Sequence, residues 1–301
     1  MLPLGDDATM LERAVMPSGP YSLALSARAA GDATRSFREG RLDAVVLARG
    51  GGGQAEARAE RASAWQRPDG AVVLRAETEA GFAALHFQLA LDDDHTPFLE
   101  RFAGDPLLGP SLRQLRSLRQ LRVGSVAQSL LRALCGQLIE SGRARAIERT
   151  VVRAVAPRVG DLCAPPTSAQ LAGLAPARLH ALGLHARRGA TLVRVCEALD
   201  LERLHGFDTA VAARLERERG LGPWSVGVVC LEGLGRSERG LVGDLGLVVL
   251  LGELLGRRVE GHETAALLDR YGEWAGLASV YLLAGARRGL VPTGTGLPAT
   301  A

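Results

Sequence analysis

The first third of the chain alternates apolar and polar residues at a period of two. Four pieces show it: residues 21–25, 43–47, 72–76 and 82–91. Alternation at this period places the apolar side chains on one face of a β-strand. Pro68-Asp69-Gly70, just before the third piece, has the residue types of a tight turn. We therefore expect a small antiparallel sheet here.

From residue 123 onward the apolar spacing becomes that of helices. Residues 123–155 predict helices that are interrupted near Gly136 and Ser141-Gly142, and Thr167 or Ser168 offers a cap for the next helix. Further helical stretches cover 179–204, 245–255 and 264–283. The predicted fold class is α+β, with a small antiparallel sheet followed by a predominantly α-helical core.

The predicted sheet and helical core are treated as separate domains. We expect an N-terminal α+β domain over residues 1–110, a helical core over 111–290 and a mobile tail over 291–301. The tail is rich in Pro, Gly and Thr and has no apolar period.

Composition adds one chemical restriction and one asymmetry of charge. All 36 basic residues are arginine, so no lysine side chain is present to form a Schiff base. Residues 1–110 hold 11 Arg and 16 acidic residues, whereas residues 111–301 hold 25 Arg and 17 acidic residues. The helical part is therefore the basic one, as expected of a domain that contacts phosphates, although a solvated charged surface gives the same count.

Leucine and arginine each repeat every three residues from Leu112 to Arg122. A period of three drifts around a helix of 3.6 residues per turn, so the repeat does not form one clean face. We favour a solvated helix or turn over a dedicated track for DNA.

The four cysteines, Cys135, Cys163, Cys196 and Cys230, are widely spaced. This spacing favours buried free thiols in a reducing compartment over zinc ligands or disulfides. The sequence begins without a signal-type segment and has no apolar run as long as a membrane span. We expect a cytoplasmic protein with no membrane partner.

The run from Val211 to Val228 predicts two helices joined by a tight hairpin. A helical pattern leads into Gly220-Leu221-Gly222, and Pro223 then stands where the first position of a helix accepts proline. Two glycines let the backbone turn sharply and leave the first amides of the second helix facing outward, where an anion such as a DNA phosphate can bind. An ordinary αα-hairpin is the alternative reading of the glycines alone.

Asp244 follows 24 residues after Gly220, directly before the apolar run 245–255. It is first of all a helix N-cap, and this position favours the ionised carboxylate. An ionised carboxylate beside a deoxyribose can stabilise positive charge that develops at C1′ as a base leaves.

The sequence GLGPWS followed by GLGRSERGLVGDLGL resembles the helix-hairpin-helix superfamily of DNA glycosylases, and within it the 3-methyladenine DNA glycosylase II (AlkA) type. The similarity spans residues 89–290 and, more loosely, the sheet, which the resemblance implies is like that of TATA-binding protein. Cys230 is the last cysteine, so the iron-sulfur loop of some relatives is absent from this sequence. We expect no cofactor.

The resemblance also implies roles for individual residues. Asp244 becomes the catalytic carboxylate. The base pocket would be lined by Trp224, Val228, Leu245 and Leu283. The DNA-binding residues would be Gly220, Leu221, Gly222, Ser225, Gln137 and Leu138, with Leu138 entering the duplex where a nucleotide has been flipped out. Packing in a core is the alternative reading for Leu138 and for Trp224.

The implied activity is hydrolytic removal of alkylated purines from double-stranded DNA by a monomeric, monofunctional enzyme, associated with a bacterial nucleoid. Trp224 stands where bifunctional relatives carry the Schiff-base lysine. The backbone carbonyls of Glu216, Glu218 and Leu221 are candidates to hold a monovalent cation at the hairpin. Val228, Leu245 and Leu283 replace aromatic residues of the family, which leaves two alternatives open: a changed range of lesions, or a DNA-binding protein without excision activity.

Overall fold

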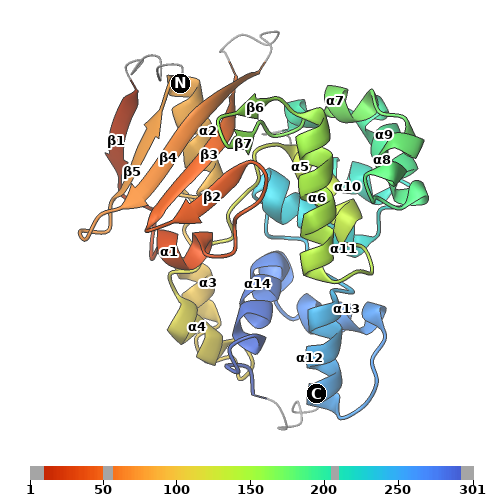
Figure 1. Ribbon diagram of the computed structural model, residues 1–301. Helices are drawn as coiled ribbons and strands as arrows, with labels where there is room; N and C mark the ends of the chain where they lie inside the picture. The colour runs from red at the N-terminus through yellow and green to blue at the C-terminus, as the bar shows by residue number, and fades with distance from the viewer. Residues whose placement is uncertain (1–9, 50–56, 205–209, 293–301) are drawn as a thin grey trace.

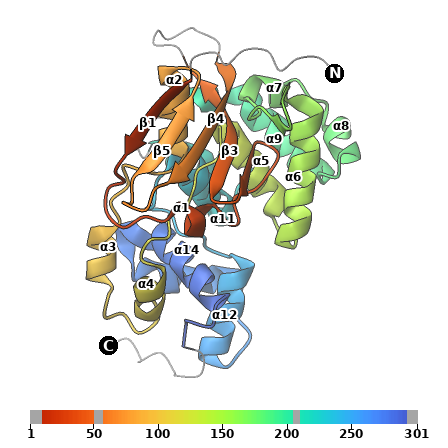
Figure 2. The same cartoon turned by 60° about the vertical axis from the view of Figure 1, so that its left-hand side comes forward.

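The computed structural model describes residues 10–49, 57–204 and 210–292. The predicted tail lies outside the described residues from 293 onward. Figures 1 and 2 show an antiparallel sheet on one side of the molecule and helices beside and below it. Mixed α+β architecture is therefore confirmed.

The sheet has five antiparallel strands in the order β1-β5-β4-β3-β2. The strands are β1 (Leu11–Val15), β2 (Arg35–Arg38), β3 (Arg41–Ala48), β4 (Arg58–Gln66) and β5 (Val72–Ala76). The predicted strands at 43–47 and 72–76 are confirmed as β3 and β5, and the turn before β5 places Gly70 at φ +92°. From Ala44 onward β3 is buried on both faces: Ala44 and Val46 pack within the N-terminal part, and Val45 packs against the helical core.

Two predicted strands are wrong. Residues 21–25 lead into α1 (Leu23–Ala27), because the Ser22 side chain accepts a hydrogen bond from the Leu25 amide and caps a helix. Residues 82–91 belong mostly to α2 (Glu79–Gln88), which Thr78 caps in the same way. In both segments a capped first turn outweighs the apparent alternation of apolar residues.

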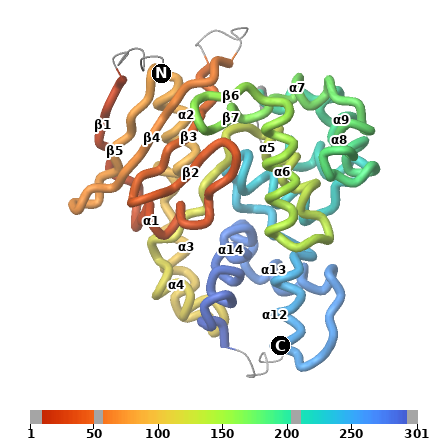
Figure 3. Tube along the Cα trace, viewed as in Figure 1, coloured from red at the N-terminus to blue at the C-terminus, as the bar shows by residue number. Residues whose placement is uncertain are grey.

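α1 and α2 pack with the sheet, and the other helices form one group beside the sheet and one below it (Figure 3), each with its own hydrophobic cluster. One cluster contains α5 (Val126–Gly136), α6 (Ser141–Val155), α7 (Ser168–Ala172), α8 (Pro176–Ala181), α9 (Ala186–Ala198), α10 (Ala210–Glu216) and α11 (Pro223–Val228), the last continued by a π-helical turn, η2 (Val229–Leu234). A 3-10 turn, η1 (Leu201–Leu204), and a short ladder of β6 (Arg158–Val159) and β7 (Leu162–Cys163) complete it.

The second cluster joins parts of the chain that are distant in sequence. It contains α3 (Thr96–Arg101), α4 (Gly109–Leu115), α12 (Leu245–Leu255), α13 (Thr264–Asp269) and α14 (Ala275–Ala286), with the 3-10 turns η3 (Gly261–Glu263) and η4 (Gly272–Trp274). Tyr281 on α14 is fully buried and donates a hydrogen bond to the Leu118 carbonyl at 3.0 Å. The boundary at residue 110 stays a prediction, and α4 spans that residue.

The leucine and arginine repeat at 112–122 is not a solvated helix throughout. Arg119 is 1% exposed, and its guanidinium donates to the carbonyls of Ala90, Ser18 and Pro20. Arg122 is also buried and pairs with the Asp93 carboxylate at 2.6 Å. Both arginines therefore satisfy backbone and acidic groups inside the protein, because the chain after α4 passes between the sheet and the helices.

All four cysteines are buried free thiols, as the sequence predicted. Burial raises the pKa of Cys196 and of Cys230 to about 12. Neither thiol is therefore a nucleophile at neutral pH. Within the described residues no helix is long and apolar enough to cross a bilayer.

Candidate active site

The predicted helix, hairpin and helix are confirmed as α10, a turn and α11. Gly220 has φ +94°, and a Cβ placed on it would lie 2.6 Å from the Thr191 hydroxyl of α9, so only glycine fits this turn. Leu221 is buried and anchors the hairpin in the core, whereas Gly222 is exposed. Pro223 begins α11 without a side-chain cap, which leaves the first amides of the helix for an outside acceptor.

The end of α5 is fastened to this hairpin by Gln137. Its side-chain amide donates to the Gly220 carbonyl at 3.0 Å and to the Ser225 hydroxyl at 2.9 Å. Ser225 itself is buried. Leu138, the next residue, is 84% exposed and has φ +55°, a conformation that leucine rarely adopts. Core packing is therefore excluded for Leu138.

Asp244 is the N-cap of α12, as predicted. Its Oδ1 accepts a hydrogen bond from the Gly246 amide at 2.8 Å. Its Oδ2 accepts from the indole Nε1–H of Trp224 at 2.9 Å. The carboxylate is half-buried, and each of its oxygens accepts one hydrogen bond at the N-terminus of α12.

The other three residues predicted to line a base pocket lie in different surroundings. Val228 is buried in the cluster around α5 and α11. Leu245 is 53% exposed at the start of α12, and Val249, one turn further along, is 60% exposed. Leu283 is half-buried on α14 and lies against Gly246, where a Cβ would approach it to 2.6 Å. The structure thus places an exposed apolar strip and Leu283 beside Asp244, with Val228 inside the core.

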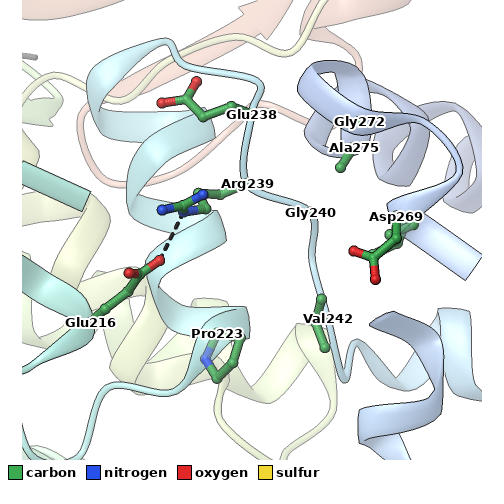
Figure 4. Close-up of a pocket in the computed structure, with 10 residues that line it drawn as sticks. Glu216, Pro223, Glu238, Arg239, Gly240, Val242, Asp269, Gly272 and Ala275 are labelled. Atoms are coloured by element: carbon green, nitrogen blue, oxygen red, sulfur yellow. Dashed lines mark ion pairs between the residues drawn. The ribbon is translucent and has the colours of Figure 1, made fainter. Parts of the chain in front are cut away.

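A cavity of about 210 Å³ lies beside Pro223, at the start of α11 (Figure 4). Pro223 and Val242 form part of its wall, and Arg239 pairs with Glu216 across it at 2.8 Å. Glu238 and Asp269 add two further carboxylates, so the lining is acidic overall. The four predicted pocket residues do not line this cavity. Its charge does not suit a nucleic-acid phosphate.

A guanidinium lies beside Glu218, one of the three residues whose carbonyls are predicted to hold a cation. Arg194 on α9 pairs with the Glu218 carboxylate at 2.5 Å and donates to the Arg219 carbonyl. The Glu218 carbonyl also accepts the Leu221 amide hydrogen bond at 3.1 Å. A metal ion held by the Glu218 carbonyl would lie close to the positive charge of Arg194, which disfavours such an ion. Elsewhere in the described residues no group of three or more His, Cys, Asp or Glu side chains is placed to hold a metal.

Two residues of the site were not assigned roles from the sequence. Arg194 is one basic residue among many in its helix, and only the packing of α9 against the hairpin distinguishes it. Gly136 contacts Trp224, since a Cβ on Gly136 would lie 2.6 Å from Cη2 of the indole. In the sequence, Gly136 is marked only as the glycine directly before Gln137. Its contact with Trp224 becomes visible only in the fold.

Comparisons with known proteins agree on the fold. No protein-family model matches the sequence. A DNA-3-methyladenine glycosylase of Bacillus subtilis is 24% identical over 210 residues, which cover 66% of this chain and 69% of that protein.

Several solved structures match almost the whole chain, among them the following two. A 3-methyladenine DNA glycosylase from Archaeoglobus fulgidus has a TM-score of 0.74 at 17% identity, covering 92% of this chain and 98% of that one. An 8-oxoguanine glycosylase/lyase from Clostridium acetobutylicum, in complex with double-stranded DNA, has a TM-score of 0.72 at 15% identity, covering 93% and 99%. The resemblance to the helix-hairpin-helix DNA glycosylases is thus confirmed at the level of the fold, which this chain shares with both structures.

Proposed function

We propose that this protein is a monofunctional DNA glycosylase that removes alkylated purines from double-stranded DNA. The observation that carries the proposal is the Asp244 carboxylate. It is held at the start of α12 by the Gly246 amide and the Trp224 indole, next to a glycine hairpin that offers backbone amides to a phosphate. The Bacillus subtilis relative supports the choice of substrate.

The proposed reaction needs an anion more than an acid. An alkylated purine is already cationic, so when the C1′–N bond breaks its electron pair neutralises the leaving base. Positive charge then develops at C1′ in an oxocarbenium-like transition state, and Asp244 stabilises it until water adds. Each Asp244 oxygen has a second lone pair beyond the hydrogen bond described above, so the carboxylate can act without losing its supports.

In the proposed complex, DNA contacts both sides of the hairpin. Gly220, Gly222 and the first amides of α11 bind the backbone, while exposed Leu138 fills the space of the flipped nucleotide. Leu245 and Leu283 contact the base. The enzyme would act as a monomer in the cytoplasm, and its sheet would be of the TATA-binding-protein type.

The proposal is tested with duplex DNA that has been treated with a methylating agent, by measuring released bases. Native protein should release 3-methyladenine and 7-methylguanine. Asp244→Asn should lose activity by roughly 100-fold or more, while its amide oxygen still caps α12. Absence of release by the native protein would favour the alternative of DNA binding without excision.

Strand cleavage is the second readout of the same assay. The chain has no lysine, and Trp224 occupies the relevant position, so we expect intact abasic strands. A covalent DNA complex trapped by borohydride on a side chain would contradict the monofunctional assignment. The exposed strip of Leu245 and Val249 favours a shallow site, so a panel of lesions of increasing size should be included.

A further inference from the structure

The indole of Trp224 has one polar atom, and that atom faces the candidate catalytic group. Nε1–H donates to Asp244 Oδ2 at 2.9 Å, so the edge of the ring is directed at the carboxylate. A wall that only stacks on a base would use the ring face and would not need the N–H. The observed contact therefore indicates a role for Trp224 beyond the predicted one as a wall of the base pocket.

The ring is fixed at its opposite edge by α5. A Cβ on Gly136 would lie 2.6 Å from Cη2 of Trp224 and 3.5 Å from each neighbouring ring carbon. The six-membered ring therefore abuts the last residue of α5, at a place where any side chain would displace it. Moving the ring away would carry the N–H out of hydrogen-bond range of Asp244.

The next residue of each segment adds a second contact between the end of α5 and α11. Gln137, next to Gly136, donates to the hydroxyl of Ser225, which is next to Trp224. The neighbouring pairs 136–137 and 224–225 thus contact each other directly, one apolar contact beside one hydrogen bond. This double contact sets the indole at a defined position between α5 and α12.

We infer that Trp224 is a positioning residue whose indole N–H orients the Asp244 carboxylate, with Gly136 as the seat of the ring. The inference rests on the proposed function. Oδ1 is held by the helix backbone and Oδ2 by the indole, so the two donors together fix the plane of the carboxylate. Either donor alone would leave the group free to rotate.

The decisive variant keeps the ring and removes the N–H. Benzothienylalanine at position 224 has sulfur where the indole has nitrogen, and it preserves shape and stacking. We expect its single-turnover excision rate to fall roughly 10- to 100-fold, because a hydrogen bond to a charged group is lost, while its affinity for abasic duplex DNA stays native. A native excision rate in this variant would overturn the inference and leave Trp224 as a wall only.

Two further measurements separate orientation from packing. In an Asp244→Asn background the same replacement should have far less effect, since the group to be oriented is already disabled. An equal effect in both backgrounds would argue against coupling. Gly136→Ala should lower the excision rate in the same direction as the sulfur variant, and native activity in Gly136→Ala would contradict the role of the glycine.

A spectroscopic readout does not depend on excision. The chain has three tryptophans and therefore three indole N–H signals, of which Trp224→Phe identifies one. This signal should shift in Asp244→Ala while the other two stay in place. If it does not move, the hydrogen bond is absent in solution. If the Trp224 signal shifts in Asp244→Ala but the native protein releases no base, the hydrogen bond is real and the proposed function is wrong.

Discussion

At the scale of single residues, Leu138 is the most unusual, because both its exposure and its backbone conformation are unfavourable for leucine. A large apolar side chain is 84% exposed, and its backbone lies at φ +55°, where a Cβ is unfavourable. Neither burial nor conformational preference explains the residue. The proposed insertion of this side chain into a DNA duplex would account for both features.

Leu138→Gly is expected to separate folding from function. Glycine relieves the backbone strain, so the free energy of unfolding in urea should stay the same or rise by up to about 1 kcal/mol. Excision should fall roughly 10-fold or more, because nothing then fills the gap of the flipped base.

The control for Leu138 is Met16, which is 67% exposed. Met16→Ala should change neither stability nor excision. If Leu138→Gly lowered the free energy of unfolding by about 2 to 5 kcal/mol, as truncation of a buried leucine does, the exposed position of Leu138 would be contradicted.

At the scale of elements, the hairpin was predictable and its support was not. Two glycines and a proline at fixed spacing allow few local conformations, so helix, turn and helix follow from the sequence. Thr191 and Arg194 on α9 back this turn, and their place depends on how α9 packs.

Arg194→Gln tests whether the guanidinium at the hairpin takes part in binding DNA. Arg194 is 44% exposed, so it can keep its bonds to Glu218 and Arg219 and still face a phosphate. We expect weaker binding to duplex DNA and a decrease of about one in the slope of log K against log salt concentration. Titrations at several salt concentrations measure both.

The matched control replaces an arginine of similar exposure at the turn before β5. Arg67 pairs with Asp69 at 3.0 Å, and Arg67→Gln should leave the salt slope unchanged. Equal slopes in native protein and Arg194→Gln would show that this guanidinium only braces the hairpin.

At the scale of the whole molecule, a buried ionic cluster joins the N-terminal part to the helices. Arg132 on α5 pairs with Asp32 before β2 at 2.7 Å, with Glu148 on α6 at 2.8 Å and with Glu232 of η2 at 2.6 Å. Burial opposes ionisation of Asp32, but Arg35 and Arg132 outweigh it and lower its pKa. Three segments therefore depend on one guanidinium.

Arg132→Met should destabilise the protein by about 3 to 5 kcal/mol, since it leaves buried carboxylates without their partner. Urea denaturation measures the loss. Because the pKa of Asp32 is lowered in the folded state, its contribution is present above about pH 4 and is lost as the pH falls further. Arg132→Met has already lost part of this contribution, so the difference in the free energy of unfolding between native protein and variant should shrink as the pH falls below about 4.

An exposed pair of the sheet serves as the control for Arg132. Arg41 lies 2.9 Å from Asp43, and both side chains are about half exposed. Arg41→Met should change stability by less than about 1 kcal/mol, because solvent screens such pairs. Similar losses in both variants would contradict a special role for the buried cluster.

The sequence by itself determined the local features of this protein. The hairpin, the Asp244 cap with its helix at 245–255, and the breaks at Gly136 and Ser141 all follow from interactions within a few residues. The strands predicted at 21–25 and 82–91 were wrong because the apolar period was weighed above the helix caps at Ser22 and Thr78, which are also local features.

Only the tertiary structure decided which distant groups meet. The contact of Trp224 with Asp244 spans 20 residues and that of Gln137 with Gly220 spans 83, and no local pattern encodes either pairing. The burial of Arg119 and the exposure of Leu138 have the same origin. Each is set by how the sheet and the two helical clusters pack, because the partners of a side chain depend on the whole fold.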